Sequence, residues 1–99
     1  MVAYEIAFSE EARAHLWGFT AGERRVVLGR VGALLASEPE RETRNLKVLR
    51  PNPLSKYELR VGTFRVFFEV DREKDRVLVL AVGRKEGNTF AIAGEAVTL

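Results

Sequence analysis

Residues 57–70 read YELRVGTFRVFFEV, and this stretch decides the fold. Apolar and polar side chains alternate on both sides of Gly62-Thr63, but the parity of the alternation changes across that pair. Such a change predicts two antiparallel strands joined by a two-residue turn, and glycine in the first turn position favours type II′. The register that follows pairs five positions: Val61 with Phe64, Arg60 with Arg65, Leu59 with Val66, Glu58 with Phe67 and Lys56 with Glu69.

The segment before this hairpin predicts one strand and two helices. Residues 4–8 alternate in the manner of a strand with one buried face. Ser9 is a plausible N-cap for a helix that runs to about Trp17, and Thr20 with Glu23 forms a capping box for a second helix that Pro39 limits. We expect the two helices to form an antiparallel hairpin that packs on a sheet through four residues: Val27, Val31, Leu34 and Leu35.

Further strands are expected on both sides of the central hairpin. Residues 46–49 are a short candidate strand, residues 71–75 make a turn, and residues 77–82 are apolar on both faces, as in a central strand. Residues 83–99 remain ambiguous between loop, strand and helix. The predicted fold class is therefore α+β: an N-terminal strand and an antiparallel helical hairpin packed on a small, mostly antiparallel β-sheet.

Length and composition restrict the class of protein. A chain of 99 residues fits one domain, residues 1–99, and 46% hydrophobic with 30% charged residues excludes a disordered or collagenous chain. The absence of cysteine excludes disulfides and Cys-based zinc sites, which makes a reduced cytoplasmic setting the expectation. The longest apolar run has six residues, whereas a membrane span needs about 20, so no membrane partner is expected.

Basic residues gather in the middle of the chain. Residues 45–70 carry five basic and two acidic residues, whereas residues 1–44 carry six basic and seven acidic ones. Like charges opposed across strands, as at Arg60 and Arg65, cost about 0.2–1 kcal/mol, and a phosphate between them would remove that cost. The alternative stays open that Glu58 neutralises the arginines and that Lys56 pairs with Glu69 on a solvated face.

Other candidate residues carry weaker signals. His15 is the sole histidine and has no partner at catalytic or metal-binding spacing, so we expect it to be structural. No nucleotide-binding or zinc-hydrolase motif occurs, and neither a cofactor nor a metal is expected. Trp17 and Phe19 are expected in the core rather than in a base-stacking platform. Phe67, on the charged face of the hairpin, is expected to pack a partner or, less favourably, to stack on a base.

The hairpin of residues 57–68, followed by Ala81-Val82-Gly83-Arg84-Lys85, resembles the RelE/ParE superfamily of toxins from type II toxin-antitoxin systems. The likeness extends over nearly the whole chain. It implies a microbial RNase fold, a cognate antitoxin that binds through an acidic amphipathic segment, and, in the RelE branch, cleavage of mRNA on the ribosome. The implied reaction is metal-free attack of a ribose 2′-OH on the adjacent phosphate.

The resemblance also implies roles for particular residues. Arg65 matches the arginine that contacts the scissile phosphate, with Arg60 assisting it. Lys56 matches a lysine of the site and is one candidate base, and Arg84 and Lys85 match a basic pair near the leaving oxygen. The substrate-binding candidates are Glu58, which is also a rival base, Phe67 and Lys47.

Two departures from the RelE pattern keep other functions open. Glu58 stands where the founding branch has a second lysine, and the branch's C-terminal tyrosine has no clear match near Phe90. One alternative is a ParE-like inhibitor of DNA gyrase without nuclease activity. The other is an inactive module that only binds an antitoxin.

Overall fold

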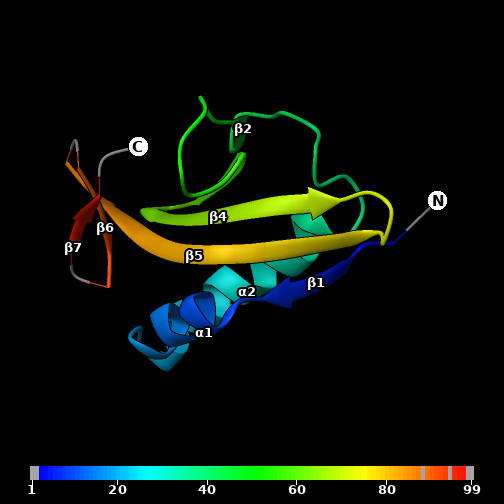
Figure 1. The fold of residues 1–99 in the computed structure, drawn as a ribbon. Coiled ribbons are helices and arrows are strands. Elements are labelled where there is room, and N and C mark those ends of the chain that lie inside the picture. Colours follow the sequence, from blue (N-terminus) through cyan, green and yellow to red (C-terminus); the bar gives the residue numbers. More distant parts are fainter. Residues whose placement is uncertain (1–2, 88, 94, 98–99) are drawn as a thin grey trace.

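In the computed structural model, which describes residues 3–87, 89–93 and 95–97, two helices lie against one side of a mostly antiparallel sheet (Figure 1). The elements follow in the order β1 (Glu5–Phe8), α1 (Glu10–Trp17), α2 (Ala21–Leu35), β2 (Leu46–Val48), β3 (Tyr57–Val61), β4 (Phe64–Asp71), β5 (Arg76–Glu86), β6 (Thr89–Ile92) and β7 (Glu95–Val97). The sheet order is β2-β3-β4-β5-β6-β7, and β1 pairs in parallel with β5. The predicted α+β class is confirmed.

Both helices begin where their capping residues predict. The Ser9 side chain accepts a hydrogen bond from the Ala12 N–H at 3.1 Å, and both halves of the Thr20–Glu23 capping box are present. The predicted apolar stripe of α2 faces the sheet and is buried, except that Leu34 is only partly covered. Neither helix in the described ranges is long and apolar enough to cross a membrane.

The central hairpin has the predicted register. Arg60 lies opposite Arg65 and Glu58 opposite Phe67, and Gly62 adopts φ +59°, which a type II′ turn requires at its first position. The ladder ends at Tyr57, so the predicted pairing of Lys56 with Glu69 does not form as a cross-strand pair. Instead, the Glu69 carboxylate accepts a hydrogen bond from the backbone N–H of Lys56.

Strand β5 is central, as predicted, but it extends beyond the apolar run of residues 77–82 from which it was predicted. It pairs with β4, β1 and β6, and its register against β4 shifts at a bulge. Ala81 opposes Phe67 while Val79 opposes Phe68, which leaves Leu80 as the extra residue. Because the bulge reverses the alternation, Val82 and Val79 both face the helices. The ambiguous tail forms the end of β5, then β6 and β7 (Figure 1).

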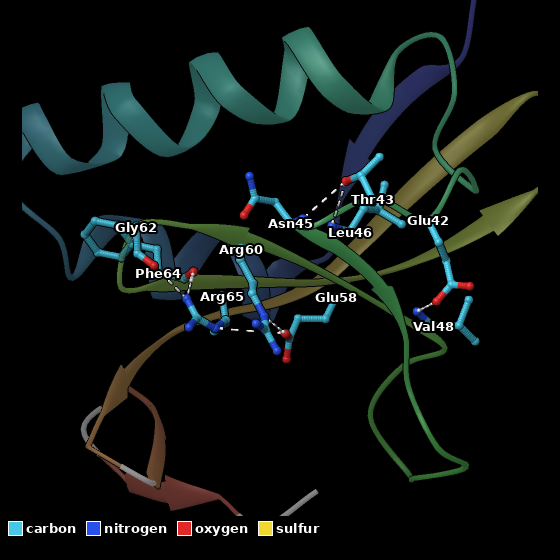
Figure 2. Close-up of polar contacts among 10 residues, drawn as sticks. All are labelled: Glu42, Thr43, Asn45, Leu46, Val48, Glu58, Arg60, Gly62, Phe64 and Arg65. Carbon is cyan, nitrogen blue, oxygen red and sulfur yellow. Dashed lines mark hydrogen bonds and ion pairs between the residues drawn. The ribbon is translucent and has the colours of Figure 1, made fainter.

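The edge strand β2 is closed by the loop that precedes it (Figure 2). The Asn45 carbonyl accepts a hydrogen bond from the Arg60 N–H of β3, and the Leu49 N–H donates to the Lys56 carbonyl just before β3. The intervening Leu46 and Val48 therefore direct their backbone groups away from the sheet. The N–H of Leu46 donates to Thr43 Oγ1 at 3.2 Å, and its carbonyl accepts from the Thr43 N–H at 3.0 Å. The Val48 N–H donates to Glu42 Oε1 at 3.3 Å. Both outward backbone groups of Leu46 and the N–H of Val48 are therefore partnered within the chain.

The prediction for Trp17 is wrong, whereas that for Phe19 is confirmed. Trp17 is 74% exposed, while Phe19 packs against the core with its ring centroid 5.1 Å from that of Phe64. Helix α1 is short and presents Ala12 and Leu16 to the sheet. Trp17 is one residue beyond Leu16, about 100° around the helix, and so lies outside the buried stripe.

Candidate functional site

The side of the sheet that faces away from the helices carries three charged side chains, Glu58, Arg60 and Arg65, which we call the charged cluster (Figure 2). Glu58 Oε1 lies 3.1 Å from Arg60 Nε and 3.9 Å from Arg65 Nε. The exposed fractions of the side chains are 3% for Glu58, 9% for Arg65 and 44% for Arg60. Glu58 therefore offsets the repulsion between the two opposed arginines, and Arg60 is the cation that solvent reaches.

Arg65 is fastened to the hairpin turn. Its Nη1 donates to the carbonyl oxygens of Gly62 and Phe64, both at 2.8 Å, while its buried Nε has no hydrogen-bond acceptor within the described ranges. Burial lowers the pKa of Arg65, the Glu58 carboxylate opposes that shift, and Arg60 adds to it. Arg65 thus organises the turn and contributes positive charge from beneath the surface.

Phe67 does not lie on an open surface, contrary to expectation. It is completely buried, and its ring meets that of Phe90 edge-on at a centroid distance of 6.1 Å. Strand β6 returns antiparallel to β5 and brings Phe90 over this face. Phe67 is therefore unavailable to a base or a partner.

A glycine in β5 allows strand β6 to approach the charged cluster closely. Gly83 lies opposite Arg65 in the sheet. A Cβ at this position would come within 2.5 Å of the Ala91 oxygen and 2.8 Å of Ile92 Cγ1. Strand β6 thus occupies the space beside Arg65 that a side chain at position 83 would fill.

Arg84 does not join the charged cluster, also contrary to expectation. It lies opposite Phe64 on the helix side, where its Nη2 is 2.7 Å from Glu23 Oε2 and its guanidinium carbon is 4.7 Å from the Phe64 ring centroid. A hydrogen bond from the Thr20 backbone, and next the bond from Arg84, lower the pKa of Glu23. Successive residues of a strand face opposite sides, so only Lys85 of the basic pair shares the face of the cluster.

The remaining candidates lie at different distances from the cluster. Lys47 is directly opposite Glu58 in the β2–β3 pair, so its side chain starts beside the cluster. Lys56 precedes β3, and its ammonium lies 5.6 Å from the Tyr57 ring centroid. In extended chain, Lys56 is two residues, about 7 Å, from Glu58 and four residues, about 13 Å, from Arg60. Lys47 and Lys56 thus both start next to Glu58, but the ammonium of Lys56 lies near the Tyr57 ring.

His15 binds the backbone of β5. Its Nδ1 accepts a hydrogen bond from the Val82 N–H at 3.2 Å, between the stretch of β5 that pairs with β1 and the stretch that pairs with β6. Burial lowers the pKa of His15, and Glu11 opposes that shift. This arrangement agrees with a structural role. Within the described ranges, no group of three or more His, Asp or Glu side chains is placed to hold a metal ion.

Solved structures that resemble this chain include toxins and toxin-antitoxin complexes. A chain of the RelBE2 complex from Mycobacterium tuberculosis superposes with a TM-score of 0.75 at 28% identity, covering 86% of this chain and 94% of the other. The isolated RelE toxin of E. coli gives a TM-score of 0.66 at 27% identity, with 85% and 86% covered. The chain is a RelE-like toxin. The resemblance noted in the sequence is thereby confirmed.

The likeness extends to more distant structures but not to sequence-based comparisons. The RelE–RelB complex of Pyrococcus horikoshii OT3 matches the RelE-like toxin with a TM-score of 0.68 at 18% identity, covering 88% of this chain and 99% of the other, and so supports the fold alone. No protein-family model and no curated protein sequence matches the toxin.

Sequence reasoning missed Phe90 and the strand that carries it. A signal was present, because Gly-Asn at 87–88 precedes a segment rich in β-forming residues, Thr89–Ile92, as in a hairpin. The contact of Phe90 with Phe67 required knowledge of which face β6 covers.

Proposed function

We propose that this RelE-like toxin is a ribosome-dependent mRNA endonuclease that acts in the cytoplasm and is held inactive by a cognate antitoxin. The observation that carries the proposal is the charged cluster, in which a buried carboxylate and a partly exposed guanidinium stand side by side. A carboxylate can accept a proton, and a guanidinium fork can stabilise charge that grows on phosphate oxygens. Transesterification of RNA needs both tasks at neighbouring atoms.

The proposed step breaks one bond and forms one. The ribose 2′-OH attacks the adjacent phosphorus, its proton passes to a base, and the bond from phosphorus to the 5′-oxygen of the next nucleotide breaks. The products are a 2′,3′-cyclic phosphate and a 5′-OH end. Arg60 contacts the phosphate, and Arg65 supports it through the field of its fixed charge.

Glu58 is a better-placed base than Lys56. Its carboxylate is already hydrogen-bonded to Arg60, so a phosphate on Arg60 brings the 2′-OH close to Glu58. Lys56 starts about 7 Å from Glu58 along the chain, but its ammonium lies near the ring of Tyr57, which belongs to the core beneath the helices. Lys85, on the same face, is the remaining candidate to protonate the leaving oxygen, and Lys47 binds a flanking phosphate. Arg84 has no role in this chemistry, since it is paired with Glu23 across the sheet.

The partner that restrains the toxin is proposed from its structural neighbours. One of them, RelBE2 at 28% identity, is a toxin-antitoxin complex. An acidic amphipathic segment would complement the partly exposed Arg60 and exclude RNA from the charged cluster.

A cell-free translation reaction tests the proposal. Messenger RNA 5′ ends are mapped after addition of the wild type, Arg60→Gln, or Arg30→Gln as a control on the exposed side of α2. Glutamine keeps an N–H donor for Glu58 but removes the charge, so cleavage by Arg60→Gln should fall about 10²- to 10³-fold, with Arg30→Gln at the wild-type rate. Cuts should fall within ribosome-occupied codons and leave 5′-OH ends. Intact mRNA with excess folded toxin would reject the nuclease.

A gyrase-directed toxin without nuclease activity is the second candidate. The burial of Phe67 and the position of the Lys56 ammonium beside the Tyr57 ring favour it, because both residues are drawn away from the roles that RNA cleavage would give them. Inhibition of gyrase supercoiling by a toxin that leaves mRNA intact would select this candidate. Expression that arrests neither growth nor supercoiling would select the inactive antitoxin-binding module.

A further inference from the structure

The tryptophan at the end of α1 stands out on the helix side of the molecule. Trp17 is the sole tryptophan of the chain and is 74% exposed, the highest value among the large apolar residues of the described ranges. An indole is among the most favourable groups to remove from water. Its exposure therefore marks a position where a ligand gains much by covering it.

Two arginines stand beside this indole. The guanidinium carbon of Arg24 lies 4.5 Å from the Trp17 ring centroid, and its Nη1 donates to the carbonyls of Leu16 at 3.2 Å and Phe19 at 3.0 Å. Arg13 is exposed and precedes Trp17 by four residues in α1, which places the two side chains next to each other on the helix surface. The three residues form a row: Arg24 lies over one face of the indole, Arg13 neighbours Trp17 along the helix, and the rest of the indole is open to solvent.

Neither arginine has an acidic partner among the residues that the structure describes. The ion pairs formed among residues 3–87, 89–93 and 95–97 involve Arg41, Arg60, Arg65, Arg72, Arg76 and Arg84, but not Arg13 or Arg24. Arg24 is moreover held in position by its two carbonyl contacts, so it loses little side-chain freedom when it binds an anion. The row thus offers two arginines without an ion pair among the described residues, one over a face of the indole and one beside it along the helix.

We propose that Arg13, Trp17 and Arg24 form a second RNA-binding site, in which an unpaired base stacks on the indole and the two guanidinium groups contact neighbouring phosphates. Stacking on an aromatic ring together with backbone contacts to cations is how proteins hold single-stranded nucleic acid. A purely apolar partner would not use the two charges, and a free phosphate would not use the ring.

The position of the row gives the site a distinct task. The helices cover one face of the sheet, and the charged cluster lies on the other. One RNA segment can therefore occupy the Trp17 row while another reaches the cluster. The row docks the toxin on structured or looped RNA and takes no part in the bond-breaking step. The choice of RNA as ligand rests on the proposed function, but binding at the row does not require cleavage.

Intrinsic fluorescence tests this site directly, because Trp17 is the only tryptophan. The probe is a single-stranded RNA decanucleotide with 2′-O-methyl riboses, which the proposed reaction cannot cleave. Addition of this RNA should quench Trp17 emission saturably. Two phosphate contacts predict a slope of about −1.4 for log K against log salt concentration, and loss of one contact should bring the slope to about −0.7.

Variants separate the row from the charged cluster. Arg13→Gln should weaken quenching and halve the salt slope, and it leaves the carbonyl contacts of Arg24 in place. Arg30→Gln and Arg60→Gln should leave the quenching curve unchanged. In an Arg60→Gln background, Trp17→Ala should weaken binding of a fluorescently labelled decanucleotide about 5- to 150-fold, and Trp17→Phe should recover most of that loss.

The results of the quenching experiments can be told apart from those of the cleavage assay. Absence of quenching at RNA concentrations approaching millimolar would overturn the site, as would quenching that disappears in Arg60→Gln but persists in Arg13→Gln. Quenching by an acidic peptide but not by the decanucleotide would assign the row to a protein partner and overturn RNA as its ligand. Quenching by RNA in a toxin that leaves mRNA intact would reject the proposed nuclease while supporting the site.

Discussion

Replacing Phe67 with alanine should destabilise the toxin severely. Phe67 is completely buried, and the Phe90 ring lies 6.1 Å from it. Truncation of a buried phenylalanine to alanine costs about 3–5 kcal/mol, through lost burial and the cavity that remains. A phenylalanine that served only to contact a base or a partner would cost about 0.5 kcal/mol or less. The two interpretations of this residue therefore differ at least several-fold in the free energy of unfolding.

Urea denaturation followed by far-UV circular dichroism measures this difference, since the exposed Trp17 is a poor reporter of core packing. In thermal unfolding, each 1 kcal/mol lowers the Tm of a domain this size by about 4–8 °C, so Phe67→Ala should melt at least about 12 °C below the wild type. A double-mutant cycle of Phe67→Leu and Phe90→Leu should give a coupling energy of about 0.5–1.5 kcal/mol. A loss below about 1 kcal/mol, with no coupling to Phe90, would refute the packing argument.

Three further predictions follow from the site and its supports. Glu58→Gln should slow mRNA cleavage about 10²- to 10⁴-fold, whereas Lys56→Gln should stay near the wild-type rate; the reverse order would make Lys56 the base. Gly83→Ala should destabilise the toxin by about 1–3 kcal/mol in urea, because its Cβ would come within 2.5 Å of the Ala91 oxygen; an unchanged urea midpoint would mean that β6 yields freely. Burial lowers the pKa of His15, so its contribution to stability is complete above the unfolded value near 6.5 and is lost as the pH falls below it. The urea midpoint should therefore drop between about pH 7 and 5, and His15→Gln should flatten this dependence; an equal drop in the variant would assign it to other groups.

The local elements were predictable because their signals lie within a few residues. Ser9 and Thr20 mark helix starts through their own side chains, and the parity change at Gly62 fixes the hairpin register. The faces of β5 were not predictable, since residues 77–82 are apolar throughout and give no alternation to follow. The bulge at Leu80 then decides that Arg84, rather than Lys85, turns toward the helices.

The membership of the charged cluster was predictable, but its burial was not. The register alone placed Arg60 opposite Arg65 and Glu58 on the same face. The fixed position of Arg65 depends on the turn carbonyls that it binds, and the burial of Phe67 depends on a ring from a strand 23 residues further along the chain. Trp17 was assigned to the core on its residue type, although an eight-residue helix has room for only a narrow buried stripe.

The hydrogen bonds that Thr43 and Glu42 make to β2 have a consequence for how the sheet meets other chains. An incoming strand would have to displace groups tethered only three and six residues from the backbone that they bind. Tethering over such short lengths corresponds to an effective concentration of about millimolar, which a foreign strand at micromolar concentration cannot match. Thr43 and Glu42 therefore outcompete a foreign strand for the backbone groups of β2. Toxin molecules should not associate through this edge into an extended sheet when the protein accumulates.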